Sequence, residues 1–140
     1  MCFRPGLARM SSYRVAGRDS CRLQGRWKVS ATLADMVVAL DERAHAEFST
    51  QGLRFPGLYI ISGYRTPAAQ AAVNPAAPNS LHTRCPALAV DLRVGDLPAS
   101  VTDPVIWGGL GRWWNEMGGR WGGTFTPPDW NHFDLGTAGF

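Results

Sequence analysis

Apolar residues recur at helical spacing in the segment 30–52, SATLADMVVALDERAHAEFSTQG. Spacings of three and four residues put its apolar side chains on one face, which predicts an amphipathic helix. Ser30 is a suitable N-cap for this helix, and Gly52 can end it. We expect a short alanine-rich helix at 67–73, opened by a proline, and another helix at 103–119, where three glycines weaken the pattern.

Three segments have the composition of β-strands. The first, LYIISGYRT at 58–66, is rich in β-branched and aromatic residues and stops at its Ser-Gly pair. The second, ALAVDLRV at 87–94, alternates large apolar residues with small and polar ones, which predicts one face in a core and the other on the floor of an open site. The third, HFDL at 132–135, alternates in the same way.

This alternation places candidate chemistry on one side of the sheet. Phe133 and Leu135 should face the core, which leaves His132 and Asp134 on the other side of their strand. Asp91 lies on the equivalent side of its own strand. We therefore expect Asp91 and His132 to point into one cleft.

Composition limits the fold class and the cellular location expected for the protein. A chain of 140 residues is the size of one ordinary domain, and its 16 glycines and 10 prolines indicate many loops. It has no apolar run near 20 residues and no N-terminal apolar stretch of the secretory kind. We expect a monomer that is made in the cytoplasm without a signal peptide.

Charge divides the chain near residue 28. Residues 1–28 carry seven basic residues against one acid, whereas the remainder carries seven against ten. We expect a basic, poorly ordered arm at 1–28 and a folded domain at 29–140. The arm is either a solvated leader or a contact for an anionic partner such as a wall polymer, nucleic acid or a membrane surface. Without aromatic interleaving or helical spacing, no specific nucleic-acid binding is expected.

The cysteines and one histidine offer weaker signals. Cys2, Cys21 and Cys85 are odd in number and widely spaced, which is not the pattern of a disulfide framework and fits a reducing compartment. Cys85 stands three residues after His82, at a metal-like spacing, but a thiolate there would close the site against water. His45 is expected at the surface or half-buried beside the first helix's apolar stripe.

Two imidazoles and one carboxylate form the main candidate site. His82 on a loop, Asp91 and His132 suit Zn²⁺ and leave a fourth tetrahedral position open, as in catalytic zinc sites. Asp129, three residues before His132, is the candidate general base, and Arg65 the candidate stabiliser of a developing oxyanion or binder of a substrate carboxylate. For Asp134, two interpretations stay open: an orienting partner of an imidazole, or a solvated carboxylate.

Three blocks of sequence resemble a known family. SGYRT, SLHTRCPALAVDL and PPDWNHFD match, in order and spacing, the signature blocks of the M15 zinc peptidases, which include D-Ala-D-Ala carboxypeptidases and dipeptidases and phage L-alanyl-D-glutamate endopeptidases. The resemblance covers roughly residues 58–136. It implies a small single α+β domain in which a central antiparallel sheet, flanked by helices, holds the metal, as in the related hedgehog domain.

The resemblance also implies roles for single residues. It assigns one zinc ion per chain to His82, Asp91 and His132, the base to Asp129, electrostatic stabilisation to Arg65 and a substrate-binding hydroxyl to Ser80. Two departures are visible. The loop between the first histidine and the aspartate is two residues longer than usual, with Cys85 where a glycine is expected, and the base is aspartate where many relatives have glutamate.

The function that follows is hydrolysis of peptidoglycan stem peptides, by a phage-type endopeptidase acting as an endolysin or as a virion component. Such a lysin reaches the cell wall after release by a partner, or on the virion. Two alternatives stay open: a D-Ala-D-Ala carboxypeptidase or dipeptidase, and a non-catalytic zinc-binding module of the same fold.

Overall fold

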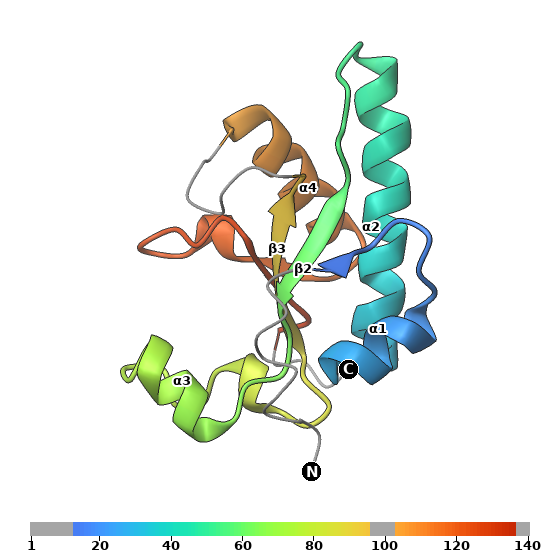
Figure 1. Ribbon diagram of the computed structural model, residues 1–140. Coiled ribbons are helices and arrows are strands. Elements are labelled where there is room, and N and C mark those ends of the chain that lie inside the picture. The colour runs from blue at the N-terminus through green and yellow to red at the C-terminus, as the bar shows by residue number, and fades with distance from the viewer. Residues whose placement is uncertain (1–12, 96–102, 137–140) are drawn as a thin grey trace.

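A central antiparallel sheet organises the chain (Figure 1). The computed structural model describes residues 13–95 and 103–136, and within these ranges five strands and four α-helices make one small α+β domain. The strands are β1 (Tyr13–Arg14), β2 (Leu58–Ser62), β3 (Ala89–Val94), β4 (Arg120–Trp121) and β5 (His132–Asp134). The helices are α1 (Ser20–Trp27), α2 (Ala31–Thr50), α3 (Pro67–Val73) and α4 (Pro104–Glu116), with short 3₁₀ turns η2 (Leu81–Thr83) and η3 (Gly122–Thr124).

The strand order is β1-β2-β3-β5-β4, and every neighbouring pair is antiparallel. Strands β3 and β5 are therefore adjacent although about forty residues separate them in the chain. Helices α1, α2 and α4 contribute to the core, whereas α3 projects from the end of β2 (Figure 1). This arrangement leaves one face of the sheet free of long helices.

The expected alternation along the strands is confirmed. The core face consists of apolar side chains that are almost fully buried: Leu58, Ile60, Val90, Leu92, Val94 and Phe133. The opposite face, called the open face below, carries the polar residues of β3 and β5. Because side chains alternate along a strand, burial of one set in the core directs the other set to the open face.

The helices expected from the sequence are present with small shifts at their ends. Ser30 caps α2, its hydroxyl accepting the backbone N–H of Leu33 at 3.1 Å, and a left-handed Gly52 (φ 73°) follows the helix. The threonine before α3 caps that helix in the same way. No helix in the described part of the chain is long and apolar enough to cross a membrane.

Two of the three glycines of α4, Gly109 and Gly111, have a packing reason. A Cβ on Gly111 would lie 2.1 Å from the ring of Trp121, and a Cβ on Gly109 would lie 3.1 Å from Phe48. Glycine has a low intrinsic helix propensity, but it occurs at these two positions because a larger side chain would push the rings away. The sequence pattern showed the propensity loss but not the rings that explain it.

The expected boundary at residue 28 falls inside the packed domain. Strand β1 pairs with β2, and Val15 and Leu23 are 1% and 0% exposed in the core. Residues 13–28 therefore belong to the fold, while residues 1–12 of the expected arm lie outside the described residues. The sequence missed this because a two-residue strand and an eight-residue helix are held by partners distant in the chain.

Candidate metal centre

Strand register brings two of the candidate ligands together. In the antiparallel pairing of β3 with β5, Asp91 lies directly opposite His132, and on the other side of β3 it lies opposite Ser62. Side chains directly opposite each other on one face are close neighbours. The open face therefore places Asp91 and His132 side by side, as the sequence predicts.

His82 reaches the same place from η2. Ser80 opens this turn, its hydroxyl accepting the backbone N–H of His82 at 3.3 Å. The imidazole is 1% exposed, and its Nδ1 lies 2.7 Å from the carbonyl oxygen of Gly63. Since a carbonyl only accepts, Nδ1 carries the proton and Nε2 keeps its lone pair. Ser80 thus acts as a cap in this structure and also lines the pocket described below.

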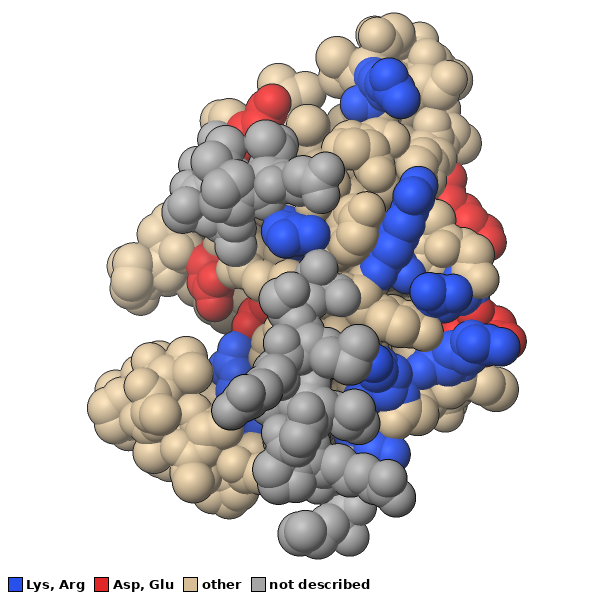
Figure 2. All heavy atoms as spheres, viewed as in Figure 1, with Lys and Arg blue, Asp and Glu red and all other residues tan. Residues whose placement is uncertain are grey.

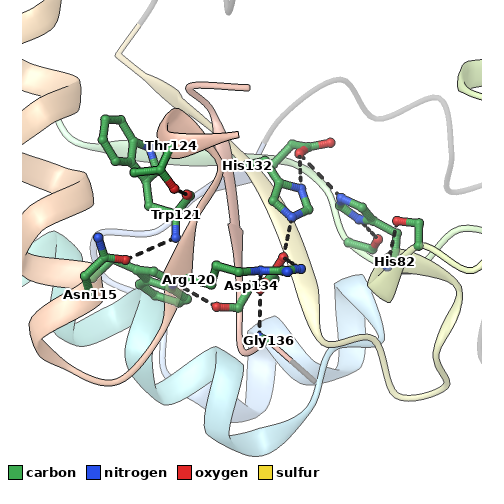
Figure 3. Close-up of polar contacts among 12 residues, drawn as sticks. His82, Asn115, Arg120, Trp121, Thr124, His132, Asp134 and Gly136 are labelled. Atoms are coloured by element: carbon green, nitrogen blue, oxygen red, sulfur yellow. Dashed lines mark hydrogen bonds and ion pairs between the residues drawn. The ribbon is translucent and has the colours of Figure 1, made fainter. Parts of the chain in front are cut away.

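His132 is oriented through its other nitrogen. Its Nε2 lies 2.6 Å from Oδ2 of Asp134, which is fully buried and held by two hydrogen bonds from Arg120, at 2.8 and 3.0 Å. In Figure 3, Asp134 and its partner Arg120 lie on one side of His132, and His82 lies on the other. Asp134 is therefore an orienting partner rather than a solvated carboxylate, and Nδ1 of His132 faces Asp91.

The three donor atoms converge. Oδ1 of Asp91 lies 3.4 Å from Nε2 of His82 and 3.5 Å from Nδ1 of His132, and the donor atoms of all three residues lie within 4.8 Å of one another. With zinc–ligand bonds of roughly 2.0–2.1 Å, neighbouring ligands of a tetrahedral site lie roughly 3.3 Å apart. Within the described residues, the buried Nε2 of His82 has no hydrogen-bond partner. The group fits a metal ion.

Charge in this cluster is set by the partners of each group. Burial raises the pKa of Asp91, but the neighbouring imidazoles and the guanidinium of Arg65 hold it well below its usual range. Burial opposes the charged form of His132, yet its bonds to Asp134 and Asp91 outweigh this and raise its pKa to about 9. The partners of each group therefore favour the ionised carboxylate of Asp91 and the protonated form of His132.

Arg65 lies beside the ligands rather than across the pocket from them. Its guanidinium pairs with Asp91, and it donates to Ser62 and to Gln70, each at 3.1 Å. Its backbone N–H also donates to the carbonyl of His82 at 2.8 Å. These contacts use three of the five guanidinium N–H donors among the described residues, which leaves two for a bound oxygen.

Asp129 lies on the loop before β5, at the rim of the site. Its backbone N–H donates to the carbonyl of Gly122 at 2.8 Å, and its carbonyl accepts from the backbone of His132 at 3.2 Å. A Cβ on Gly122 would lie 2.3 Å from that Asp129 carbonyl, so this close approach requires glycine. Burial and the charge of Asp91 raise the pKa of the Asp129 carboxyl.

A pocket of about 660 Å³ opens over the cluster. All six residues expected to form the site line it: Arg65, Ser80, His82, Asp91, Asp129 and His132. It also includes residues that the sequence did not indicate, among them Gln70, Arg120 and Phe125. Gln70 is 2% exposed and was visible only as the polar position of the alanine-rich helix, whereas Arg120 and Phe125 offered no pattern of their own.

The weaker sequence signals have separate outcomes. Cys85 is disulfide-bonded and is not a thiolate ligand, while Cys21 is free and exposed. The expectation that the cysteines form no framework of bridges therefore missed the bond at Cys85. His45 is half-exposed and lies 3.5 Å from Asp41, away from the candidate metal centre.

A scan of protein-family models finds no match to the chain, and a search of curated proteins finds none either.

Proposed function

We propose that the protein is a zinc-dependent peptidase that hydrolyses the stem peptides of peptidoglycan, as a phage-type endopeptidase with the M15 arrangement of ligands. The observation that carries the proposal is the convergence of His82, Asp91 and His132 at a pocket that the acid Asp129 also lines. Two imidazoles and one carboxylate are a ligand set of catalytic rather than structural zinc sites. The three sequence blocks of the resemblance coincide with the pocket lining.

Each residue of the site would have a separate role in peptide hydrolysis. Zinc held by the three ligands would supply Lewis-acid polarisation of the scissile carbonyl and of the attacking water. Asp129 would accept a proton from that water and pass it to the leaving amine, a transfer helped by the raised pKa of its carboxyl. The remaining donors of Arg65 would bind the oxygen on which negative charge develops.

The ligand tautomers support this assignment. The Gly63 carbonyl and Asp134 each hold one ring nitrogen of a histidine, so that His82 presents Nε2 and His132 presents Nδ1 to the same carboxylate oxygen. Outer partners of this kind fix the orientation of histidine ligands and raise their basicity. A chance cluster of polar side chains would not need such support.

The substrate class rests on the resemblance together with the shape of the site. Peptidoglycan stems are short peptides, and the pocket volume of about 660 Å³ suits a few residues of such a peptide. An endopeptidase requires a groove open at both ends, whereas a carboxypeptidase must recognise a terminal carboxylate. We infer that the protein acts at the bacterial cell wall, after release or as part of a virion.

Digestion of purified peptidoglycan tests the proposal. The protein loaded with one zinc per chain should release fragments cut within the stem, identified by mass spectrometry. Asp129→Asn should keep the zinc and lose roughly 10²–10⁴ in rate, because proton transfer contributes about that much. Asp35→Asn, an exposed aspartate on α2, is the matched control and should retain wild-type activity.

The alternatives predict different outcomes of the same digestion. Free D-alanine without stem cleavage would replace the endopeptidase with a D-Ala-D-Ala carboxypeptidase. Stoichiometric zinc with no hydrolysis of any wall fragment would indicate a non-catalytic zinc module. Full activity of Asp129→Asn would contradict the assigned base, whatever the substrate.

A further inference from the structure

A row of arginines lies on the opposite edge of the sheet from β4. Arg14, Arg18, Arg22 and Arg26 recur every four residues, and the last three of them, Arg18, Arg22 and Arg26, are called the arginine face below. Arg18 lies in the turn after β1, and Arg22 and Arg26 share one side of α1 because residues four apart are neighbours on a helix. Arg14 is not part of this face, because it points to the opposite side of β1 from Tyr13, toward Gly57 and His45. Figure 2 shows Lys and Arg side chains gathered over this region, at the right of the view.

Aromatic rings hold two of these arginines together. The guanidinium carbons of Arg18 and Arg26 lie 4.8 and 5.1 Å from the centroid of the same Tyr13 ring, and Arg26 also lies 5.5 Å from the ring of Trp27. Cation–π contacts stabilise each arginine individually. They also gather two like charges around one ring, and a bound anion would lower the repulsion between them.

The described residues do not supply that anion. Arg43, Arg65 and Arg120 each pair with a carboxylate, but within the described residues no ion pair involves a member of the arginine face. The one acid in this segment, Asp19, caps α1 by accepting the backbone N–H of Arg22 at 2.9 Å. Among the described residues, the buried Nη2 of Arg26 has no hydrogen-bond partner, and its guanidinium contacts only aromatic rings.

We propose that the arginine face binds a polyanion of repeated phosphodiesters without bases, namely a polyol-phosphate polymer of a cell wall. Arginine is suited to phosphate because its planar fork donates two parallel hydrogen bonds. The aromatic rings at this face, Tyr13 and Trp27, already carry guanidinium groups, so they offer no stacking platform of the kind that single-stranded nucleic acids use.

The place of this face in the fold suits a tether. It lies at the β1 edge, with β2 between it and the strands of the metal centre, and none of its arginines lines the pocket. A bound polymer would therefore keep the protein at the wall without occupying the cleft. This function goes beyond peptide hydrolysis. The choice of a wall polymer among polyphosphates rests on the proposed function, but binding itself requires no hydrolysis.

Binding to soluble poly(glycerol phosphate) tests the proposal, because this probe contains no peptide bond. The Arg18→Gln/Arg22→Gln variant should bind about tenfold more weakly than the wild type at low salt. Its affinity should also fall less steeply with salt, the slope decreasing by about one per arginine that contacts a phosphate. Arg54→Gln/Arg112→Gln removes the same charge from exposed positions elsewhere and should bind as the wild type does.

Three results would overturn the proposal: no binding by the wild type, equal weakening in both double variants, or tighter binding of duplex DNA than of poly(glycerol phosphate) at matched phosphate and salt. Circular dichroism and cleavage of a soluble stem peptide should be unchanged in Arg18→Gln/Arg22→Gln. If that variant misfolds, the single change Arg22→Gln, at an exposed helix position, gives the same comparison with a smaller effect. If the wild type does not cleave the stem peptide, that result would count against the peptidase proposal only.

Discussion

The two faces of the sheet both lie against buried carboxylates, but the surroundings of these groups differ. On the core side, Asp41 of α2 is 3% exposed and accepts the backbone N–H of Leu58 at 3.0 Å, with His45 at 3.5 Å. Burial is the largest influence and raises the pKa of the Asp41 carboxyl. The core side therefore favours the neutral form of the Asp41 carboxyl.

On the open face, Asp134 is fully buried but is well supplied with donors. It accepts hydrogen bonds from His132, Arg120 and the backbone of Gly136, and these partners lower its pKa although burial opposes them. The difference teaches that burial by itself expels charge, and that a charge is kept only where several donors replace the lost water. Apolar packing holds the core face, and paired charges hold the open face.

Phe133 offers the largest test of this division. It is fully buried between the rings of Trp107 and Trp114, at centroid distances of 6.2 and 5.5 Å. Phe133→Ala should lower the free energy of unfolding by about 3–5 kcal/mol, with or without metal. Denaturant titration measures this, and Phe133→Leu is the milder variant should the alanine protein not fold. A loss below about 1 kcal/mol would show that this side of β5 is not packed as described.

His132, next to Phe133 on β5, should affect the stabilisation that bound metal provides. Metal that binds only the folded state stabilises it by about 2.7 kcal/mol at a free concentration of 100 times Kd. Phe133→Ala should retain this increment, whereas His132→Gln should lose it because one of three ligands is gone. The measurement is the difference in unfolding free energy between zinc-loaded and chelator-treated protein. An undiminished increment in His132→Gln would contradict the ligand set.

Asp134 gives an intermediate effect. Asp134→Asn keeps an oxygen near His132 but removes the charge that orients the ring, and metal affinity should fall about 10–100-fold. Competition with a zinc chelator measures this, and Asp35→Asn serves as the control. Equal affinity in the two variants would mean that Asp134 stabilises the fold without acting on the metal centre.

Asp41 should give the smallest effect, visible as a dependence on pH. Its folded pKa lies above the usual value of 3.8, so the folded state holds the proton more tightly than the unfolded state does. The stability associated with Asp41 is fully present below pH 3.8 and is lost as pH rises through the folded pKa. Asp41→Asn should remove this decline, because the amide still accepts from Leu58 but never ionises. Parallel pH profiles of unfolding free energy for wild type and variant would refute this contribution of Asp41.

Local patterns were sufficient for much of the fold. The helix at 31–50 followed from its spacing and its Ser30 cap, and the two faces of β3 and β5 followed from alternation. These features depend on neighbours within a few residues, which the sequence shows directly. The alternation also placed Asp91 and His132 on one face, whereas His82 was a candidate because of its residue type on the loop before β3.

Other features depended on residues far apart in the chain. The helical part of the segment 13–28 has one fully buried residue, Leu23, and its place in the core became visible only with its partners in space. The two interpretations of Asp134 could not be separated without its burial and the bonds from Arg120. Likewise, the arginine face needed the ring of Tyr13 to bring Arg18 and Arg26 together.

The sequence by itself determined which residues could form a site, because residue type and period decide which side of a strand carries chemistry. Only the tertiary structure decided which nitrogen of each histidine faces Asp91, and that Arg65 pairs with that same carboxylate. These choices depend on the carbonyl of Gly63 and on Asp134, whose distances from the rings are set by packing between separate segments. Local preference does not contain such distances.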